Sequence, residues 1–254
     1  MPPVEEQGFV IVATGDQYVD CARMLATSVR RWHTGARICL ITDNELQDPE
    51  FDYVRKLQNV NTENPWANDW QVFSLTPFRE TIKLEADMLI VSDISHWWTM
   101  LRHRDVIVST GCRNWQDQIS TSRYYRKVFD ENNLPDVYNA ITYWRLSRTA
   151  KEFFDWVREI FQHWDQYRRL IRFAEEIPST DLVYAMAAQI MGTERVTMPW
   201  ATYPRIVHMK QHIANTEHDP WTKEMVWEYL DGHLRVNTVA QWDAFHYHVK
   251  DWRP

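Results

Sequence analysis

Glycine and cysteine are both scarce in this sequence. Its 254 residues include only 6 glycines and 3 cysteines. The cysteines, Cys21, Cys39 and Cys112, stand far apart and form no C-x-x-C pair. An odd number of cysteines without metal-ligand spacing is typical of free thiols in a reducing compartment. The sequence therefore argues against a disulfide scaffold and favours a cytoplasmic protein.

Long apolar runs and an excess of positive charge are also missing. No apolar run is long enough to cross a bilayer, and the acidic start MPPVEEQ does not resemble a secretion signal. We therefore expect no membrane partner. The formal net charge of -7 disfavours a protein that coats nucleic acid with a uniformly basic surface, although it is compatible with a local basic face.

Apolar and aromatic residues, by contrast, are abundant. Hydrophobic residues make up 44% of the chain, and 14 residues are tryptophan. Flat aromatic surfaces pack in cores and also stack on sugars and bases. The length fits one large α/β domain, and neither a repeat nor a linker divides the sequence. We predict a single domain over residues 1–254.

The N-terminal part of the chain has the pattern of a β-α-β unit. Residues 8–14 and 38–42 are nearly continuous apolar runs, which are typical of buried parallel strands. Between them, apolar residues recur at three- and four-residue steps, as in an amphipathic helix. Ligands of open parallel sheets bind beyond the carboxyl ends of the strands. Five residues would then lie on the ligand side: Ala13, Thr14, Gly15, Asp16 and Tyr18.

Two carboxylates stand one residue apart at Glu85 and Asp87, directly before the apolar run 88–91. In an extended backbone, residues i and i+2 face the same side, so both acids would point one way at a strand end. Carboxylate oxygens suit a hard cation such as Mg2+ or Mn2+. The pattern predicts a metal site that holds a diphosphate. Two solvated charges at a strand end are the alternative.

Cations and aromatic rings alternate over residues 111–127 without a clear period. Such a mixture can bind phosphates and bases. A solvated helix with a loop is the alternative. The cations and rings concerned are Arg113, Trp115, Arg123, Tyr124, Tyr125, Arg126 and Lys127, and a second basic patch holds Arg168, Arg169 and Arg172.

Further elements are predicted from local patterns. Residues 149–164 form an amphipathic helix with an aromatic face, and a short strand is expected near Val60. Ser179 or Thr180 is a candidate N-cap of another helix, with Asp181 in its first turn.

The buried stripe of that helix is expected to reach Ile190, and a last helix is expected around residues 227–230. His208 lies in a short apolar run, where a lone histidine is more often structural than a ligand.

Five short motifs, taken in order, resemble those of GT-A fold glycosyltransferases, most closely the retaining, glycogenin-like group. Residues 9–32 resemble that group's opening strand, nucleotide-binding loop and helix. Residues 78–94 resemble the strand that bears its D-x-D metal motif, with Glu85 in place of the first Asp and Asp87 in place of the second. The opening motif implies uridine contacts by Ala13, Thr14, Gly15 and Tyr18.

The later motifs imply further roles. Residues 138–140, Tyr-Asn-Ala, resemble the F-N-x-G segment near the acceptor and single out Asn139. Asp181 matches the acid at a helix start that contacts the donor sugar. His208 matches the third metal ligand of a V-H-x-x-G motif, and Lys210 is placed near the diphosphate.

The resemblance implies an α/β fold of the GT-A, Rossmann-like type, in which helices flank a mostly parallel central sheet. It implies a UDP-sugar as donor and Mn2+ or Mg2+ held by Glu85, Asp87 and His208. We expect a nucleotide-binding half (1–110), an acceptor-side half (111–215) and a C-terminal helical extension (216–254).

The acceptor is left open by these motifs. Several stretches of the sequence also resemble proteins of tailed bacteriophages. This resemblance implies a hydroxymethylated pyrimidine in phage DNA as acceptor and the host cytoplasm as location. The residues that would bind it are Arg113, Arg123, Tyr124, Arg126 and Asn139. Glycan, lipid-linked and protein acceptors are alternatives. A nucleotidyltransferase and a non-catalytic binding module are competing functions.

Overall fold

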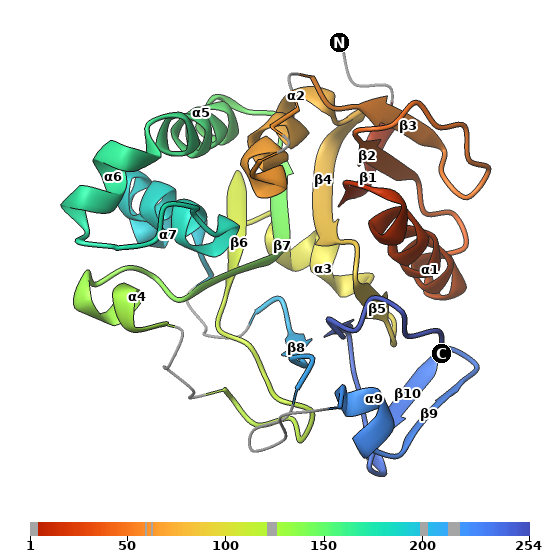
Figure 1. Cartoon of the computed structure of the whole chain (residues 1–254). Helices are drawn as coiled ribbons and strands as arrows, with labels where there is room; N and C mark the ends of the chain where they lie inside the picture. Colours follow the sequence, from red (N-terminus) through yellow and green to blue (C-terminus); the bar gives the residue numbers. More distant parts are fainter. Residues whose placement is uncertain (1–4, 59, 62, 121–125, 199–202, 213–218) are drawn as a thin grey trace.

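The computed structural model describes residues 5–58, 60–61, 63–120, 126–198, 203–212 and 219–254. Its centre is a six-stranded sheet with the order β3-β2-β1-β4-β7-β6 (Figure 1). The strands are β1 (Glu5–Ala13), β2 (Ile38–Thr42), β3 (Tyr53–Lys56), β4 (Phe78–Glu85), β6 (Val106–Thr110) and β7 (Val137–Arg145).

The central sheet is mostly parallel. Strand β1 pairs in parallel with both β2 and β4, and β2 pairs in parallel with β3. Only β7 runs against its neighbours β4 and β6. The predicted β-α-β unit is confirmed as β1, helix α1 (Asp16–Trp32) and β2.

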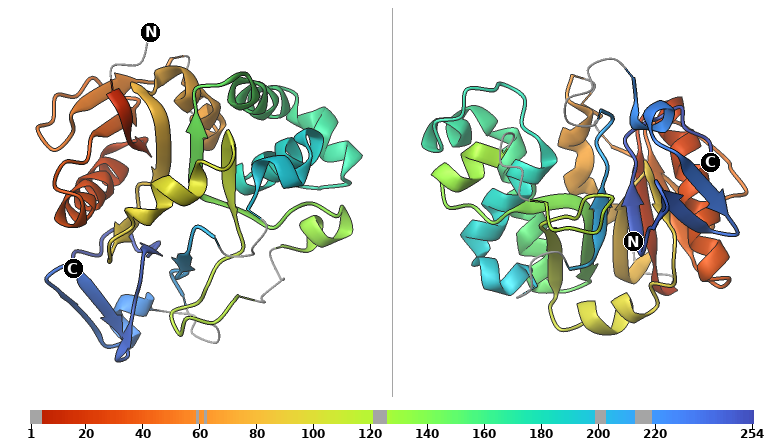
Figure 2. Two further views of the ribbon diagram at one scale, coloured as in Figure 1. Left: turned by 180° about the vertical axis from the view of Figure 1, so that it is seen from behind. Right: turned by 90° about the horizontal axis from the view of Figure 1, so that it is seen from below.

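Helices cover both faces of this sheet, as the view from below makes clear (Figure 2). One face carries α1 and α3 (His96–Leu101), and the opposite face carries a second group of helices. Those are η1 (Pro65–Gln71), α2 (Val72–Leu75), α5 (Arg148–Gln162) and α7 (Thr180–Met191), with α4 (Lys127–Glu131), α6 (Trp164–Leu170) and α8 (Thr193–Val196) nearby. The predicted mostly parallel sheet between helices is therefore confirmed.

Alternation along β1 explains why the protein has two cores. Phe9 and Ile11 belong to the core under α1, whereas Val10 between them belongs to the core under α5 and α7. Successive side chains of a strand point to opposite faces, so a continuous apolar run must be covered on both sides. The predicted helix over residues 149–164 is confirmed as α5, and it buries its aromatic face in the second core.

A smaller sheet joins three distant segments beside the carboxyl ends of the central strands (Figure 1). It consists of β5 (Met88–Ile90), β12 (Ala244–His246) and β8 (Ile206–His208), with β12 in the middle. The third sheet is formed by β9 (Trp227–Leu230), β10 (His233–Val236) and β11 (Val239–Ala240), preceded by α9 (Trp221–Glu224).

The helix expected around residues 227–230 is wrong, because this segment is strand β9. It forms a hairpin with β10 through Asp231 and Gly232, which have φ angles of 53° and 83°. An Asp-Gly pair with positive φ at both residues is a strong signal for a two-residue β-hairpin turn. The turn chemistry decided the local structure, so the described part of the C-terminal extension is mainly β structure and not helical.

Two smaller expectations also differ from the structure. The strand expected near Val60 lies earlier, as β3, and Ile190 is 45% exposed and not part of the buried stripe of α7. The predicted start of α7 is confirmed, since Ser179 Oγ accepts a hydrogen bond from the backbone N–H of Leu182 at 3.3 Å. Among the described helices, none combines the length and the apolar character that crossing a membrane requires.

Candidate functional site

The paired acids Glu85 and Asp87 lie where β4 ends. Glu85 is the last residue of β4, and Asp87 belongs to the turn that leads into β5. The backbone is therefore not extended through both residues, as the sequence argument assumed. Their carboxylates nevertheless lie close together and close to the imidazole of His246, with one ligand atom from each within 4.8 Å of the others.

Strand β12 delivers His246 to these acids. In the small sheet, His246 is paired with Met88 on one side and with His208 on the other. Residues directly opposite each other in neighbouring strands present their side chains on the same face. The register therefore brings together a histidine that the sequence singled out, His208, and one that it did not.

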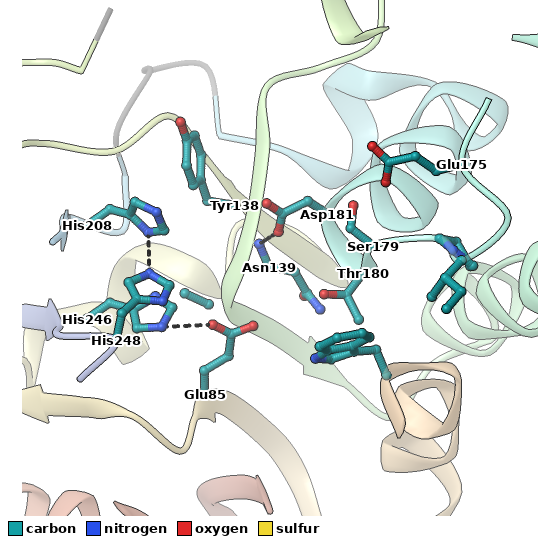
Figure 3. Close-up of a pocket in the computed structure, with 14 residues that line it drawn as sticks. Glu85, Tyr138, Asn139, Glu175, Ser179, Thr180, Asp181, His208, His246 and His248 are labelled. Carbon is teal, nitrogen blue, oxygen red and sulfur yellow. Dashed lines mark hydrogen bonds and ion pairs between the residues drawn. The ribbon is translucent and has the colours of Figure 1, made fainter. Parts of the chain in front are cut away.

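Figure 3 shows the contact of His246 with Glu85 and that of His208 with His248. His246 Nε2 lies 3.0 Å from Asp87 Oδ2 and 3.4 Å from Glu85 Oε2. His248 Nε2 lies 3.4 Å from His208 Nδ1. Asp87 and His208 are thus linked only through His246 and His248, which sequence reasoning missed, and binding of one ion by Asp87 and His208 together stays a prediction. Their H-x-H spacing at the end of a short apolar run was the available signal.

Burial and neighbouring charges shift the pKa values of this cluster in different directions. Burial opposes ionisation of Asp87, but His246 and Lys250 outweigh it and hold its pKa well below the ordinary value. Burial raises the pKa of Glu85. Burial disfavours the charged form of His246, but the neighbouring Asp87 outweighs it and raises the pKa of this imidazole.

The two outer histidines behave differently. Burial lowers the pKa of His208 well below its ordinary value, and the charge of His246 lowers it further. The same two causes lower the pKa of His248 to about 2. Both imidazoles are therefore neutral near pH 7 and keep a lone pair available for a cation.

A lysine also approaches the acids. Lys250 Nζ donates to Asp87 and lies 4.8 Å from the centre of the Tyr18 ring. Tyr18, on the first turns of α1, was predicted to lie at the nucleotide. Lys250 was not predicted, because only the fold brings the end of the described chain against this loop.

A pocket of about 470 Å3 opens beside the cluster (Figure 3). Glu85, His246, His248 and His208 form one wall, and Asn139 and Asp181 belong to the opposite wall. The remaining lining residues are Trp66, Tyr138, Ala140, Glu175, Ile177, Pro178, Ser179 and Thr180. Asn139 and Asp181, two residues that the sequence singled out separately, thus face the same space as the metal-ligand candidates.

Asp181 is held in place by two donors. Its Oδ1 accepts a hydrogen bond from the backbone N–H of Asn139 at 2.7 Å, and its Oδ2 pairs with Arg126 Nη1 at 2.9 Å. Arg126 is only 6% exposed and also pairs with Asp136. It therefore lies inside the protein, behind the pocket wall, and not on the basic surface that the sequence suggested for binding an acceptor.

A buried polar network supports the same wall from behind. Asp69 pairs with Lys83 Nζ at 2.7 Å and accepts a hydrogen bond from the hydroxyl of Tyr184. The side-chain amide of Asn139 reaches the same carboxylate at 3.3 Å, and its oxygen accepts a hydrogen bond from Thr142. Because all these groups are buried and paired, the network fixes the side chain of Asn139.

The other predicted site residues are dispersed. The backbone N–H of Gly15 donates to Asp43 Oδ1 at 3.1 Å, which fixes the loop of Thr14 and Gly15 directly after Ala13, the last residue of β1. Lys210 follows β8, is exposed, and does not line the pocket.

Of the residues predicted to bind an acceptor, Asn139 lines the pocket and Arg113 does not. The backbone carbonyl of Arg113 accepts a hydrogen bond from the N–H of His208 at 2.9 Å, but its guanidinium pairs with Asp117 at 3.2 Å. Arg123 and Tyr124 lie outside the described residues.

Comparisons with known proteins bear on the fold. No protein-family model matches the sequence, and no curated protein matches it. Among solved structures, the galactosyltransferase LgtC in complex with donor and acceptor sugar analogues has a TM-score of 0.51 and 12% identity, over 94% of this chain and 86% of that one. Mouse xyloside xylosyltransferase 1 has a TM-score of 0.53 and 9% identity, over 99% and 100% of the two chains.

This chain has the GT-A fold. The predicted fold class is thereby confirmed over nearly the whole chain. The narrower resemblance to the retaining, glycogenin-like group stays a prediction, as does the resemblance to phage proteins.

The donor atoms of the cluster fit a divalent metal ion. The Nδ1 atom of His246 is buried and has no hydrogen-bond partner among the described residues. A buried polar atom without a partner is costly, and coordination to a cation removes that cost. Carboxylates from Glu85 and Asp87 and imidazoles from three histidines are common ligands of such ions.

Proposed function

We propose that this protein is a metal-dependent glycosyltransferase that moves a sugar from a nucleotide-sugar to a hydroxyl acceptor. The observation that carries the proposal is the acid-histidine cluster at the carboxyl end of β4, in which Glu85 and Asp87 meet His246, and His246 in turn meets His208 and His248. It opens into a pocket of a GT-A fold. Ligands of open α/β sheets bind at this end of the strands.

The donor is proposed to be a UDP-sugar. Its nucleoside would bind at the loop of Ala13, Thr14 and Gly15 and at Tyr18, and its diphosphate at the acid-histidine cluster. A Mn2+ or Mg2+ ion held there by Glu85, Asp87 and His208 would supply Lewis-acid stabilisation of the leaving diphosphate.

Two parts of the protein itself would assist the transfer. Asp181 projects into the pocket and is fixed by the backbone of Asn139 and by Arg126, so it can orient a hydroxyl of the donor sugar without reorganising. Positive charge near the diphosphate would come from Lys250, which already lies beside Asp87, and from Lys210.

The acceptor side is proposed to lie at the pocket rim, where Trp66 and Ile177 are 55% and 51% exposed. A hydroxymethylated pyrimidine in phage DNA is the acceptor that the sequence suggested. Of the residues proposed to bind it, Asn139 lines the pocket and Arg113 is paired with Asp117. Sugar transfer to hydroxymethylcytosine DNA and not to unmodified DNA would support this acceptor, and transfer to a glycan or protein alone would exclude it.

The experiment for the donor is a hydrolysis assay with purified protein, Mn2+ and a panel of UDP-sugars. We expect UDP release from at least one donor. The Asp87→Asn variant is expected to lower kcat by about a hundredfold, the usual scale for losing one electrostatic group at the reacting bond.

The matched control is Asp93→Asn. Asp93 lies six residues further on, and its side chain is 61% exposed. UDP release by this variant should equal that of the wild type. Absence of both UDP binding and turnover with every donor would refute the proposal. Pyrophosphate release from a nucleoside triphosphate would identify a nucleotidyltransferase instead.

A further inference from the structure

Three imidazoles lie together at the small sheet, whereas the metal site implied by the sequence contains only one. His208 ends β8, His246 ends β12 in direct register with it, and His248 follows two residues later. One nitrogen from each lies within 4.8 Å of the others. The three rings therefore lie together, although only His208 was expected at the metal. His208 is edge-on to the other two, and His246 is stacked on His248 with 3.8 Å between ring centres, so one of the stacked rings must turn for all three nitrogens to face one ion.

The spacing of these nitrogens suits coordination. Ligands of a tetrahedral ion at a metal–nitrogen distance of about 2.05 Å lie about 3.4 Å apart. His208 Nδ1 and His248 Nε2 are separated by 3.4 Å. At 3.4 Å these two nitrogens form at most a weak hydrogen bond, whereas an ion between them would satisfy both lone pairs.

His246 provides the second, independent indication of a ligand. The residue is only 4% exposed, and its Nδ1 has no hydrogen-bond partner among the described residues. Its Nε2 is engaged with Asp87 and Glu85. The Nδ1 atom therefore remains for a group that the protein itself does not supply.

We propose that His208, His246 and His248 form a three-imidazole site for a borderline transition-metal ion such as Zn2+ or Co2+, in preference to Mg2+. Imidazole nitrogen favours these ions, whereas Mg2+ requires oxygen ligands. The inference deepens the proposed function, on which it rests for its biological use, by naming the class of ion at that site. The proposed function names Mn2+ or Mg2+ for two carboxylates and one histidine, and the present inference replaces that choice of ion, because two further histidines change the donor set.

Lys250 is a built-in competitor for part of this site. Its ammonium group neutralises Asp87 in the structure, which weakens the attraction of Asp87 for a second cation. Removal of this charge should therefore strengthen metal binding. Removal of a ligand should instead lower metal affinity, so a lysine variant and a histidine variant are expected to change the affinity in opposite directions.

The experiment is a titration of the untagged 254-residue chain, stripped with a chelator, with Co2+ and then Zn2+ and Mg2+. Binding is followed by the visible absorption of Co2+ and by calorimetry, without any sugar donor. We expect one Co2+ per chain, displaced by equimolar Zn2+ and not by a hundredfold excess of Mg2+.

The decisive variant is His248→Asn. His248 has a φ angle of 56°, a left-handed conformation that asparagine tolerates better than most residues, so the backbone should be preserved. We expect Co2+ affinity to fall at least about tenfold and the absorption band to change shape. Lys250→Met should raise Co2+ affinity severalfold. His163→Asn, at a surface histidine whose side chain is 45% exposed, is the matched control and should change nothing.

Three outcomes would overturn the inference. One is Mg2+ binding as tight as Co2+ binding, and another is unchanged Co2+ binding in His248→Asn. The third is absence of metal binding in both the wild type and Lys250→Met, which would leave Lys250 as the permanent cation at Asp87. Because donor turnover is measured separately, Zn2+ binding without turnover would refute the proposed glycosyl transfer and leave the metal site standing. Turnover without Zn2+ or Co2+ binding would refute the three-imidazole metal site and leave the proposed glycosyl transfer standing.

Discussion

Arg126 and Asp181 form an ion pair of 2.9 Å, although they are 55 residues apart in the sequence. Arg126 is buried, whereas the side chain of Asp181 is 30% exposed and faces the pocket. The pair therefore connects the interior of the protein to the candidate site.

Replacing Arg126 by Met should destabilise the protein. Asp136 and Asp181 would lose their shared cation, and removing one partner of a buried pair costs up to about 3–5 kcal/mol. Because both carboxylates are 30% exposed, water would compensate in part, and we expect about 2 kcal/mol from urea unfolding.

Lys127→Met is the control for the arginine variant. Lys127 is the adjacent residue, its side chain is 79% exposed, and it pairs with Glu131. Exposed pairs contribute less than about 1 kcal/mol, so its unfolding curve should nearly overlay that of the wild type. Equal losses in the two variants would contradict a structural role of the buried guanidinium.

Lys83→Met should be more damaging than any surface change. Lys83 is 2% exposed and contacts both oxygens of Asp69, at 2.7 and 2.8 Å. Without the ammonium, a buried carboxylate keeps only neutral partners, and we expect a loss of about 3 kcal/mol in the free energy of unfolding.

A double variant tests this reasoning. In Lys83→Met with Asp69→Asn, the charge that needs the lysine is gone, so part of the lost stability should return. Urea unfolding of the wild type, both single variants and the double variant gives the coupling free energy. Strictly additive losses would show that the two side chains act independently.

Asp52 should make stability depend on pH. Burial opposes its ionisation, but the backbone N–H of Ile38 and the side chains of Arg37 and Arg30 outweigh this and lower its pKa. A depressed folded-state pKa adds stability above the unfolded-state value of about 4 that is lost as the pH falls further. Asp52→Asn should thus be destabilised most near pH 7, and the difference should shrink below about pH 4.

The pH profile is measured as the midpoint of urea unfolding between pH 3 and 8. Glu50→Gln serves as comparison, because Glu50 is 47% exposed and lies 4.0 Å from Arg30. Its difference from the wild type should be small throughout. A difference for Asp52→Asn that stays constant with pH would exclude the carboxylate as its source.

Trp66→Ala should weaken acceptor binding once an acceptor is known. The indole lies at the pocket rim and is 55% exposed, as expected of a surface that stacks on a sugar or a base. We expect KM for the acceptor to rise about tenfold, the equivalent of 1.4 kcal/mol, with little change in KM for the donor.

The comparison for this variant is Trp242→Ala. Trp242 is 48% exposed and does not line the pocket. Its kinetics should match those of the wild type. An unchanged acceptor KM in Trp66→Ala, or the same rise in both variants, would remove Trp66 from the acceptor site.

Local patterns in the sequence predicted much of the fold. The apolar run of β1, the amphipathic face of α5 and the Ser179 cap of α7 are each determined by neighbouring residues, and each was found. The helix expected around residues 227–230 was wrong, because the Asp231-Gly232 turn that follows this segment pairs it with β10 as a strand.

The candidate site was predicted only in part, for a physical reason. Asp87, His208, Asn139 and Asp181 could be compared with known motifs, and all except Asp87 line the pocket, which Asp87 adjoins through His246. The H-x-H spacing marks His246 and His248 as possible ligands, but their placement and that of Lys250 beside the acids depend on strand pairing between segments far apart in the sequence, which a local pattern does not determine.

The position of β12 between β5 and β8 has a consequence for biosynthesis. A nascent chain that has emerged from the ribosome only as far as β8 has both outer strands of this sheet but not the strand that joins them. Neither His246 nor His248 is then present, so the proposed cation site cannot assemble until β12 has been synthesised and has joined β5 to β8.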